Sequence, residues 1–442
     1  MKLRRELGTL ALVFVLFFCT SGGAFTTEDL VASVGPGLAL AILVAVPILW
    51  SLPEVLIIGE LASMLPEEGG YYKWVRRAFG PFWAFQNAWL TWAYSIFDMA
   101  LYPAIFNHYL AYFVPALGPV ARGMISAAMI WTATALNLGG ARPVGRFSTG
   151  TGVFVILSFV AISLAALPHV SHVPWAPFAR GGEGTVGALG IGLSLALWNY
   201  TGWDNASTVQ GEVRDASRSY PRALAIGLPL VMVGYLLPLT TTLAASDWTA
   251  WREGSWPEIA RMTTGALGPV LAIWVALAGL VSALSMFNAL LLAYSRVPLA
   301  MADDGMLPAF LARIDARGTP VNVVLVSAAF YTICAFLPLQ SLVAADVLLY
   351  AIALFLEFGA LVRLRAREPE LRGAFRIPTG TAGVAALAAL PMAIMGVVVW
   401  LEMHDPEFGL PAVVYSVVAI LLGPIAYAAA REFVRAPAPA AE

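Results

Sequence analysis

The sequence predicts an all-α membrane protein with about twelve transmembrane helices. Hydrophobic residues make up 60% of the 442 residues and charged residues only 12%, whereas soluble domains carry about 25% charged residues. The mean hydropathy is +0.79, and twelve spans of roughly 20 residues each leave only short loops. No sizeable soluble domain fits in the remainder, so we expect residues 1–430 to form a single transmembrane domain.

Apolar runs bounded by charged residues, Pro or Gly predict the individual helices. In chain order these runs cover 7–35, 37–63, 80–110, 119–138, 146–168, 186–212, 219–246, 267–297, 321–338, 342–362, 383–402 and 411–430. The first run resembles a secretion signal, but Phe17 and Phe18 stand where cleavage requires small residues, so we expect an uncleaved helix. Residues 431–442 are expected to be a short disordered tail.

Basic residues are sorted between the two sides of the predicted bundle. With the N-terminus in the cytoplasm, 21 of the 25 Lys and Arg residues fall in cytoplasmic segments, and the exceptions are Arg122, Arg180, Arg252 and Arg261. This distribution follows the positive-inside rule. We therefore expect a multi-pass protein of the cell (plasma or inner) membrane with both termini in the cytoplasm.

Residues suited to catalysis or metal binding are few. Cys19 and Cys334 lie in apolar stretches, so we expect no disulfide. The outer-loop residues His169, His172 and His404 lack metal-ligand spacing, and the sequence contains no HExxH or Walker motif. We expect no metal ion, no cofactor, no nucleic-acid partner and no enzymatic activity.

Two predicted spans contain Gly and polar residues at mid-membrane depth. The first reads CTSGGAFTTED over 19–29, and the sixth reads WNYTGWDNAST over 198–208. Unwound backbone at this depth is tolerated only where it is buried in protein or lines a cavity. The matching positions predict a five-plus-five inverted repeat, 7–168 and 186–362, with a site between the breaks and peripheral helices at 383–430. Alternatively, the glycines serve only close helix packing.

Several carboxylates interrupt the apolar segments. They are Glu28, Asp29, Glu54, Glu60, Asp98, Asp204, Glu212, Asp346 and Glu357. Each costs roughly 2.5–3.5 kcal/mol at a helix centre, so an intramembrane acid is functional by default. Because Lys and Arg lie in loops or at predicted helix ends, the deepest acids suit a mobile ammonium group or a coupling proton.

Some of these acids have simpler explanations. The expected ion pairs are Glu60, Glu67 and Glu68 with Lys73, Arg76 or Arg77, and Glu212 with Arg214 or Arg218. Asp346 is expected at the membrane interface. For Glu357, about six residues before Arg363, a structural and a functional role are equally consistent with the pattern.

Asp98, Asp204 and Glu28 are the strongest candidates for a functional role. Tyr102 follows Asp98 by one helical turn, and Trp198 and Trp203 precede Asp204. An acid beside aromatic rings suits an alkylammonium ligand, which gains ion pairing together with cation–π attraction. Core packing alone would also explain the aromatic residues.

The chain resembles the amino acid–polyamine–organocation superfamily, and within it the branch of polyamine uptake transporters best known from plants. The resemblance extends over about residues 18–400. It is carried by Ser21-Gly22-Gly23 with Glu28-Asp29, Pro53-Glu54, the segment 69–74 (GGYYKW), 98–103 (DMALYP), Trp203-Asp204 with Ser207-Thr208, 211–213 (GEV), 305–308 (GMLP), 318–320 (GTP), and Glu357-Phe358 leading into 361–365 (LVRLR).

This resemblance implies an alternating-access carrier that takes up polyamines or amino acids with protons as the coupling ion, in contact with membrane lipid. The implied substrate-binding residues are Ser21, Gly22, Gly23, Phe25, Glu28, Asp98, Tyr102, Trp198, Asn199, Tyr200, Trp203 and Asp204. The alternative is a neutral or cationic amino-acid permease or exchanger, in which the glycine-rich breaks bind both ends of a zwitterion.

Four features depart from the family pattern or bear on the coupling ion. Ala24-Phe25-Thr26 stands where polyamine members usually have Pro-aromatic-Gly, and Thr201-Gly202 stands where they have Asn-Tyr. The lysine that some proton-coupled relatives carry in the fifth helix is absent between 147 and 167. Ser282 and Ser285 suit a sodium site with first-helix carbonyls, although serines in membrane helices more often bond backbone.

Overall fold

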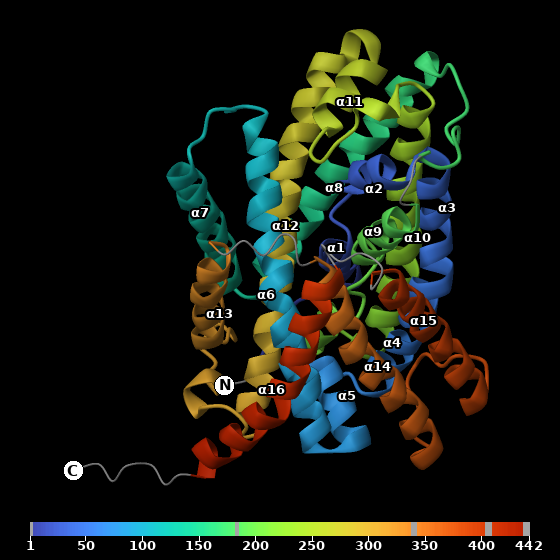
Figure 1. The fold of residues 1–442 in the computed structure, drawn as a ribbon. Helices are drawn as coiled ribbons and strands as arrows, with labels where there is room; N and C mark the ends of the chain where they lie inside the picture. The colour runs from blue at the N-terminus through green and yellow to red at the C-terminus, as the bar shows by residue number, and fades with distance from the viewer. Residues whose placement is uncertain (1–2, 182–184, 337–342, 403–408, 436–442) are drawn as a thin grey trace.

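The computed structural model describes residues 3–181, 185–336, 343–402 and 409–435 (Figure 1). Regular structure in these ranges is helical, apart from one isolated parallel β-bridge between Leu7 and Val213. The all-α prediction is therefore confirmed.

The helices of the described part divide the chain as follows. They are α1 (Thr9–Thr20), α2 (Thr27–Val34), α3 (Pro36–Val46), a π-helical turn (Pro47–Ser51), α4 (Leu52–Met64), α5 (Gly70–Phe79), α6 (Pro81–Ala111), α7 (Pro119–Leu138), α8 (Ala141–Ala166), α9 (Thr185–Trp198), the 3₁₀ helix η3 (Asn205–Glu212), α10 (Ala216–Leu243), α11 (Trp256–Thr263), α12 (Gly268–Asp303), the 3₁₀ helix η6 (Ala309–Ala312), α13 (Val321–Cys334), α14 (Val343–Arg367), α15 (Thr381–Glu402) and α16 (Gly409–Arg435).

Seven helical segments in the described ranges are long and apolar enough to cross a membrane. The other five predicted spans have evident reasons to fall outside this group. Two are divided by a break, into α1 and α2 and into α9 and η3. α13 is short, and α6 and α7 are long enough but carry many polar residues. Low hydropathy along α6 follows from the polar and aromatic side chains that it directs into the bundle.

The first predicted helix break is confirmed. α1 ends at Thr20 and α2 starts at Thr27. Between them Gly22 and Gly23 have φ values of 67° and 113°, in the left-handed region that glycine enters without steric cost. A Cβ at Gly22 would collide with Met286 and Ser282 of α12, so close packing and backbone conformation both require glycine here.

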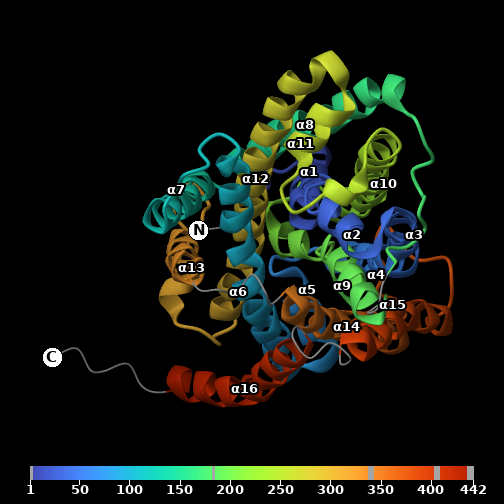
Figure 2. The same ribbon diagram turned by 45° about the horizontal axis from the view of Figure 1, so that its top comes forward.

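The second break is confirmed as well, since α9 ends at Trp198 and η3 starts at Asn205. Gly202 has a φ of 99°, and a Cβ there would collide with the carbonyl oxygen of Cys19 at the end of α1. The two breaks are thus in direct contact. Both views of the ribbon place α1 inside the bundle, within the ring formed by α6, α8, α10 and α12 (Figures 1 and 2).

Two short helices mark the ends of the bundle. α11 covers the top in Figure 1, and α5 lies at the bottom; we call these the α11 end and the α5 end. α15 and α16 pack on one flank against α14, and α16 also contacts α6 (Figure 2). They take no part in the contacts between the two breaks.

Candidate functional site

A small cavity, which we call the central cavity, lies where the two breaks meet α6, α12 and α14. Its volume is about 20 Å³, room for about one water molecule. Its wall includes Asp98, Tyr102, Trp198, Tyr294, Asp346 and Tyr350. None of its lining residues is Lys, Arg or His, so within the described chain two acids face this space without a basic side chain.

Asp98 is held in place by two tyrosines. Tyr102, one turn later on α6, donates a hydrogen bond to Oδ1, and Tyr294 of α12 donates to Oδ2 over 2.7 Å. The Tyr102 ring stacks on Trp198 of α9 with 6.5 Å between the centroids. Neutral hydroxyls orient this carboxylate without cancelling its charge, so it retains its attraction for a cation.

Asp346 lies in the first turn of α14, at the level of Asp98. Its side chain is 5% exposed, and its Oδ1 has no hydrogen-bond partner among the described residues. The expectation that Asp346 is interfacial is therefore wrong. α14 packs along α6, and this packing brings the first turn of α14 inward to the cavity wall. An unpaired carboxylate in such a place calls for a ligand or a proton.

The predicted site residues fall into three groups. Those that line the central cavity are Asp98, Tyr102 and Trp198. Those in or beside the first break are Ser21, Gly22, Gly23, Phe25 and Glu28. Those in the second break are Asn199, Tyr200, Trp203 and Asp204.

The second-break residues mostly bond outward. The Tyr200 hydroxyl donates to the Leu43 carbonyl of α3, and the Asn199 carbonyl oxygen accepts from Tyr235 of α10. Asp204 lies behind the cavity wall, with its Oδ1 2.6 Å from the hydroxyl oxygen of Tyr350. These residues therefore hold the second break in place against α3, α10 and α14 and do not themselves line the cavity.

Aromatic packing closes the cavity toward the α11 end. The Phe25 ring lies 4.9 Å from both Tyr109 and Phe159, centroid to centroid. Trp256 of α11 donates to the Ala24 carbonyl over 2.8 Å. Glu28 is fully buried in this closure, where its Oε1 accepts from the Gly254 amide over 2.9 Å and from Tyr109 over 3.3 Å.

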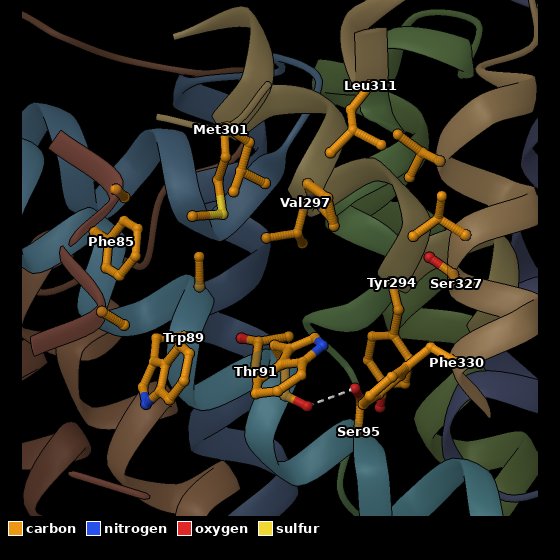
Figure 3. A pocket seen from close by; sticks show the side chains of 18 of the residues that line it. Phe85, Trp89, Thr91, Ser95, Tyr294, Val297, Met301, Leu311, Ser327 and Phe330 are labelled. Carbon is orange, nitrogen blue, oxygen red and sulfur yellow. Dashed lines mark hydrogen bonds between the residues drawn. The ribbon is translucent and has the colours of Figure 1, made fainter. Parts of the chain in front are cut away.

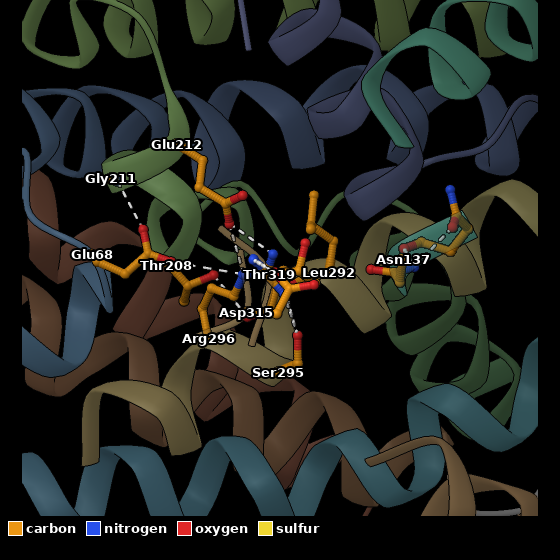
Figure 4. A network of polar contacts seen from close by, with 12 residues as sticks. Glu68, Asn137, Thr208, Gly211, Glu212, Leu292, Ser295, Arg296, Asp315 and Thr319 are labelled. Carbon is orange, nitrogen blue, oxygen red and sulfur yellow. Dashed lines mark hydrogen bonds and ion pairs between the residues drawn. The ribbon is translucent and has the colours of Figure 1, made fainter. Parts of the chain in front are cut away.

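An ion-pair network closes the bundle toward the α5 end (Figure 4). Arg296 of α12 is fully buried and donates to Glu212 Oε1 from Nε over 2.8 Å, with Nη2 at 2.7 Å from the same oxygen. Its Nε also lies 3.7 Å from Glu68 Oε1. The Glu212 carbonyl accepts the amides of Glu6 and Leu7, which ties the segment before α1 into the closure.

The same network attaches the segment before α5 to η3. The Gly69 amide donates to the Thr208 carbonyl over 2.9 Å, and Glu68 Oε2 accepts the Gly211 amide over 2.8 Å. At Gly70 a Cβ would collide with Ser207, so backbone packs directly on backbone at this point.

The predicted partners of three acids are wrong. Glu60 pairs with Arg365 of α14, whose Nε donates to Oε1 over 2.6 Å, and Glu212 pairs with Arg296. Glu68 also pairs with Arg296. Both arginines reach their acids from helices distant in sequence. The nearby basic residues are engaged elsewhere: Lys73 and Arg76 with Asp304, Arg77 with Glu368, and Arg218 with Asp215.

The serines of α12 bond carbonyl groups. Ser282 donates to the Gly22 carbonyl over 2.5 Å, and Ser285 donates to Val281 over 2.7 Å with Thr151 at 2.9 Å. In addition, no group of three or more metal-ligating His, Cys, Asp or Glu side chains occurs among the described residues.

A second cavity of about 500 Å³ lies between α6, α12, α13, η6 and α16 (Figure 3). Its walls are mainly apolar, and no charged side chain lines it. It therefore lacks a carboxylate that could pair with an ammonium group. Tyr294 lines both cavities, and its hydroxyl bonds Asp98 on the other side.

Sequence reasoning missed Tyr294, Asp346 and Tyr350. One signal was present: Asp346 and Tyr350 repeat the spacing of Asp98 and Tyr102, an acid with a tyrosine one turn later. No local pattern marks Tyr294, whose position depends on how α12 packs against α6.

Comparisons with known proteins show the family of the chain. The sequence model of a family described as amino acid permease matches residues 7–425. A polyamine transporter of Oryza sativa subsp. japonica, PUT1, is 37% identical over 90% of this chain and 74% of its own length. The polyamine transporter RMV1 of Arabidopsis thaliana is 35% identical over 95% of this chain and 85% of its own length.

Proposed function

The chain belongs to the amino acid permease family and is a multi-pass membrane transporter, and from this premise we propose that it carries organic polycations, polyamines first, by alternating access. The relatives described above are named as polyamine transporters. The one observation that carries the proposal is the pair Asp98 and Asp346, two carboxylates that face one cavity with no basic residue among its lining side chains.

The chemistry of this pair suits a diamine. Each carboxylate accepts one ammonium group, and the rings of Tyr102, Trp198 and Tyr294 surround the alkyl chain and the charges. A substrate with two positive charges neutralises both acids at once. A zwitterion would bring its own carboxylate next to two acids, which is unfavourable.

Closure at both ends supports alternating access. The central cavity holds about 20 Å³, too little for a diamine, so we treat this conformation as the occluded one, which a substrate enters only after one closure opens. We propose that the aromatic packing around Phe25 at the α11 end and the Arg296 network at the α5 end open in turn. We further propose that residues 1–430 form one domain in which the two breaks belong to an inverted repeat, 7–168 and 186–362. The distribution of basic residues supports the proposal that the protein lies in the cell membrane with its α5 end facing the cytoplasm.

The membrane potential alone would drive such a carrier. A dication that moves inward across 100 mV gains about 4.6 kcal/mol, twice the value for one charge. This corresponds to roughly a thousandfold accumulation. A neutral amino acid gains nothing from the potential and needs a coupling ion.

The test is uptake of radiolabelled putrescine or spermidine into proteoliposomes that contain the purified protein, with arginine and leucine as competitors. We expect saturable polyamine uptake. We further expect Asp98→Asn and Asp346→Asn each to weaken apparent affinity by roughly 10- to 150-fold, the equivalent of about 1.5–3 kcal/mol for a hydrogen bond to a charged group.

Asp247→Asn is the matched control, because Asp247 is an exposed acid outside the cavity. Size-exclusion profiles and thermal unfolding in detergent establish that each variant is folded. Leucine uptake without polyamine uptake would overturn the polycation proposal in favour of the amino-acid permease alternative. Wild-type affinity in both folded cavity variants would remove Asp98 and Asp346 from the site.

A further inference from the structure

A second pair of acids lies behind the wall of the central cavity. The hydroxyl oxygen of Tyr350 lies 2.6 Å from Glu54 Oε1 of α4 and 2.6 Å from Asp204 Oδ1 of the second break. The Gly202 amide donates to the same hydroxyl oxygen over 2.9 Å. Glu54 and Asp204 are 0% and 2% exposed, so water does not separate these groups from one another.

The two acid contacts at the Tyr350 hydroxyl oxygen require one more hydrogen than the phenol carries. A phenol carries one proton and so donates a single hydrogen bond. If both carboxylates were ionised, one of the two 2.6 Å contacts would join two oxygens with no hydrogen between them. Such distances are typical of a hydrogen bond to a charged oxygen, not of two repelling acceptors. One added proton on either carboxyl completes the set, because that acid then donates to the phenol oxygen.

The surroundings of the pair favour this added proton. Neither acid forms an ion pair with a Lys, Arg or His anywhere in the described ranges. The titratable groups that face the pair from neighbouring elements are Cys19 of α1, Tyr71 of α5, Tyr94 of α6, Tyr220 of α10 and Glu357 of α14. All are neutral or acidic, so two negative charges at this depth have no basic group to offset them.

We infer that Glu54 and Asp204 bind one exchangeable proton across the Tyr350 hydroxyl, and that this is the coupling proton of the carrier. The inference rests on the proposed function. Three separate elements contribute the three groups, and Asp204 belongs to the break. Movement of the break relative to α4 and α14 takes Asp204 away from Tyr350, so the bridge exists only in the occluded conformation.

The proton cycle balances without any covalent change. One proton enters from water on the side to which the cavity is open, binds one carboxylate and completes the bridge as the cavity closes. When the opposite side opens, Asp204 separates from Tyr350 and the same proton passes to water on that side. Tyr350 and Gly202 also line the central cavity, so the bound substrate and the bridged proton share one wall.

The test uses purified protein in proteoliposomes with polyamine uptake measured with and without an inward proton gradient, and a pH-sensitive dye in the lumen. We expect the wild type to accumulate more substrate with the gradient and to acidify the lumen during uptake. For Glu54→Gln, whose amide donates to the phenol without an added proton, we expect equal uptake under both conditions and no acidification. Tyr350→Phe, which removes only the bridging hydroxyl, should behave in the same way.

Glu357→Gln is the matched control, because Glu357 is also a buried acid near Asp204 but accepts from Asn87 and not from Tyr350. It should keep the gradient response. Full gradient response in Glu54→Gln, or in Tyr350→Phe if the first variant fails to fold, would overturn the inference. Wild-type polyamine uptake without lumen acidification would also overturn it and leave the proposed function standing, whereas absence of polyamine uptake would refute the proposed function itself.

Discussion

Buried carboxylates occupy two regions of the molecule and are satisfied differently in each. Near the α5 end, Glu60 and Glu212 each bind an arginine, Arg365 and Arg296 respectively. At the level of the helix breaks, the bonded acids meet tyrosine hydroxyls, and Asp346 has an oxygen with no partner in the described chain.

Under the proposed function, the arginine-paired acids serve closure and the tyrosine-bonded acids serve substrate binding. A guanidinium on a packed helix neutralises its acid and holds the two elements together while that end is closed. A tyrosine orients its acid but leaves the charge to be matched by something mobile, such as an ammonium group or a proton. We therefore expect substitutions in the arginine-paired region to change mainly stability, and substitutions in the tyrosine-bonded region to change mainly transport.

The largest effect is expected from Arg296→Met, which removes the basic partner of Glu212 in the arginine-paired region. Removal of one partner of a buried pair leaves an uncompensated charge and costs about 3–5 kcal/mol. We expect a marked fall in the midpoint of thermal unfolding in detergent. The double variant Arg296→Met with Glu212→Gln should recover much of the loss, and a double variant as unstable as the single one would contradict the pairing.

Tyr294→Phe is expected to have an intermediate effect and tests the tyrosine-bonded region. It removes the hydroxyl that donates to Asp98 and keeps the ring between the two cavities. Loss of a hydrogen bond to a charged group costs about 1.5 kcal/mol, so apparent polyamine affinity should fall about tenfold. Saturation curves of uptake provide the measurement, with Tyr331→Phe as control because Tyr331 bonds Ser95 rather than an acid. Equal affinity in both variants would show that Asp98 needs no positioning.

The smallest effect is expected at Glu368, which pairs with Arg77 outside the membrane-spanning segments. The hydrogen bond from Arg77 lowers the pKa of Glu368 below its usual range. The stability that this pair adds is therefore present at neutral pH and is lost as the pH falls through the folded-state pKa. Both side chains are more than a third exposed, so Glu368→Gln should cost less than about 1 kcal/mol at pH 7. Thermal unfolding at neutral and acid pH tests this, and a cost as large as that of Arg296→Met would remove the distinction between exposed and buried pairs.

Features encoded locally were predictable from the sequence. Gly22, Gly23 and Gly202 interrupt apolar runs, and all three adopt backbone conformations that favour glycine. The acid–tyrosine spacing at Asp98 and Tyr102 is likewise a property of one helix. These signals predicted both breaks and one half of the cavity.

Features that depend on packing between distant helices were not predictable in this way. Glu60 and Arg365 are 305 positions apart, whereas the prediction considered only nearby basic residues. Asp346 is expected at the interface from the sequence, yet the packing of α14 on α6 brings it inside. A single sequence gives helix faces and breaks, but the rotation of one helix against another decides which acids meet.

The attachment of residues 68–70 to η3 makes the segment before α5 a suitable site for a label that reports movement of η3. Because the Gly69 amide and the Glu68 side chain both bond this segment to η3, a displacement of η3 inside the bundle would be transmitted to residues outside it. Both native cysteines are buried, so a single cysteine introduced at the exposed position Glu67 would carry a fluorescent or spin label selectively. Such a label would report movements of η3 in the proposed transport cycle in real time from the aqueous side.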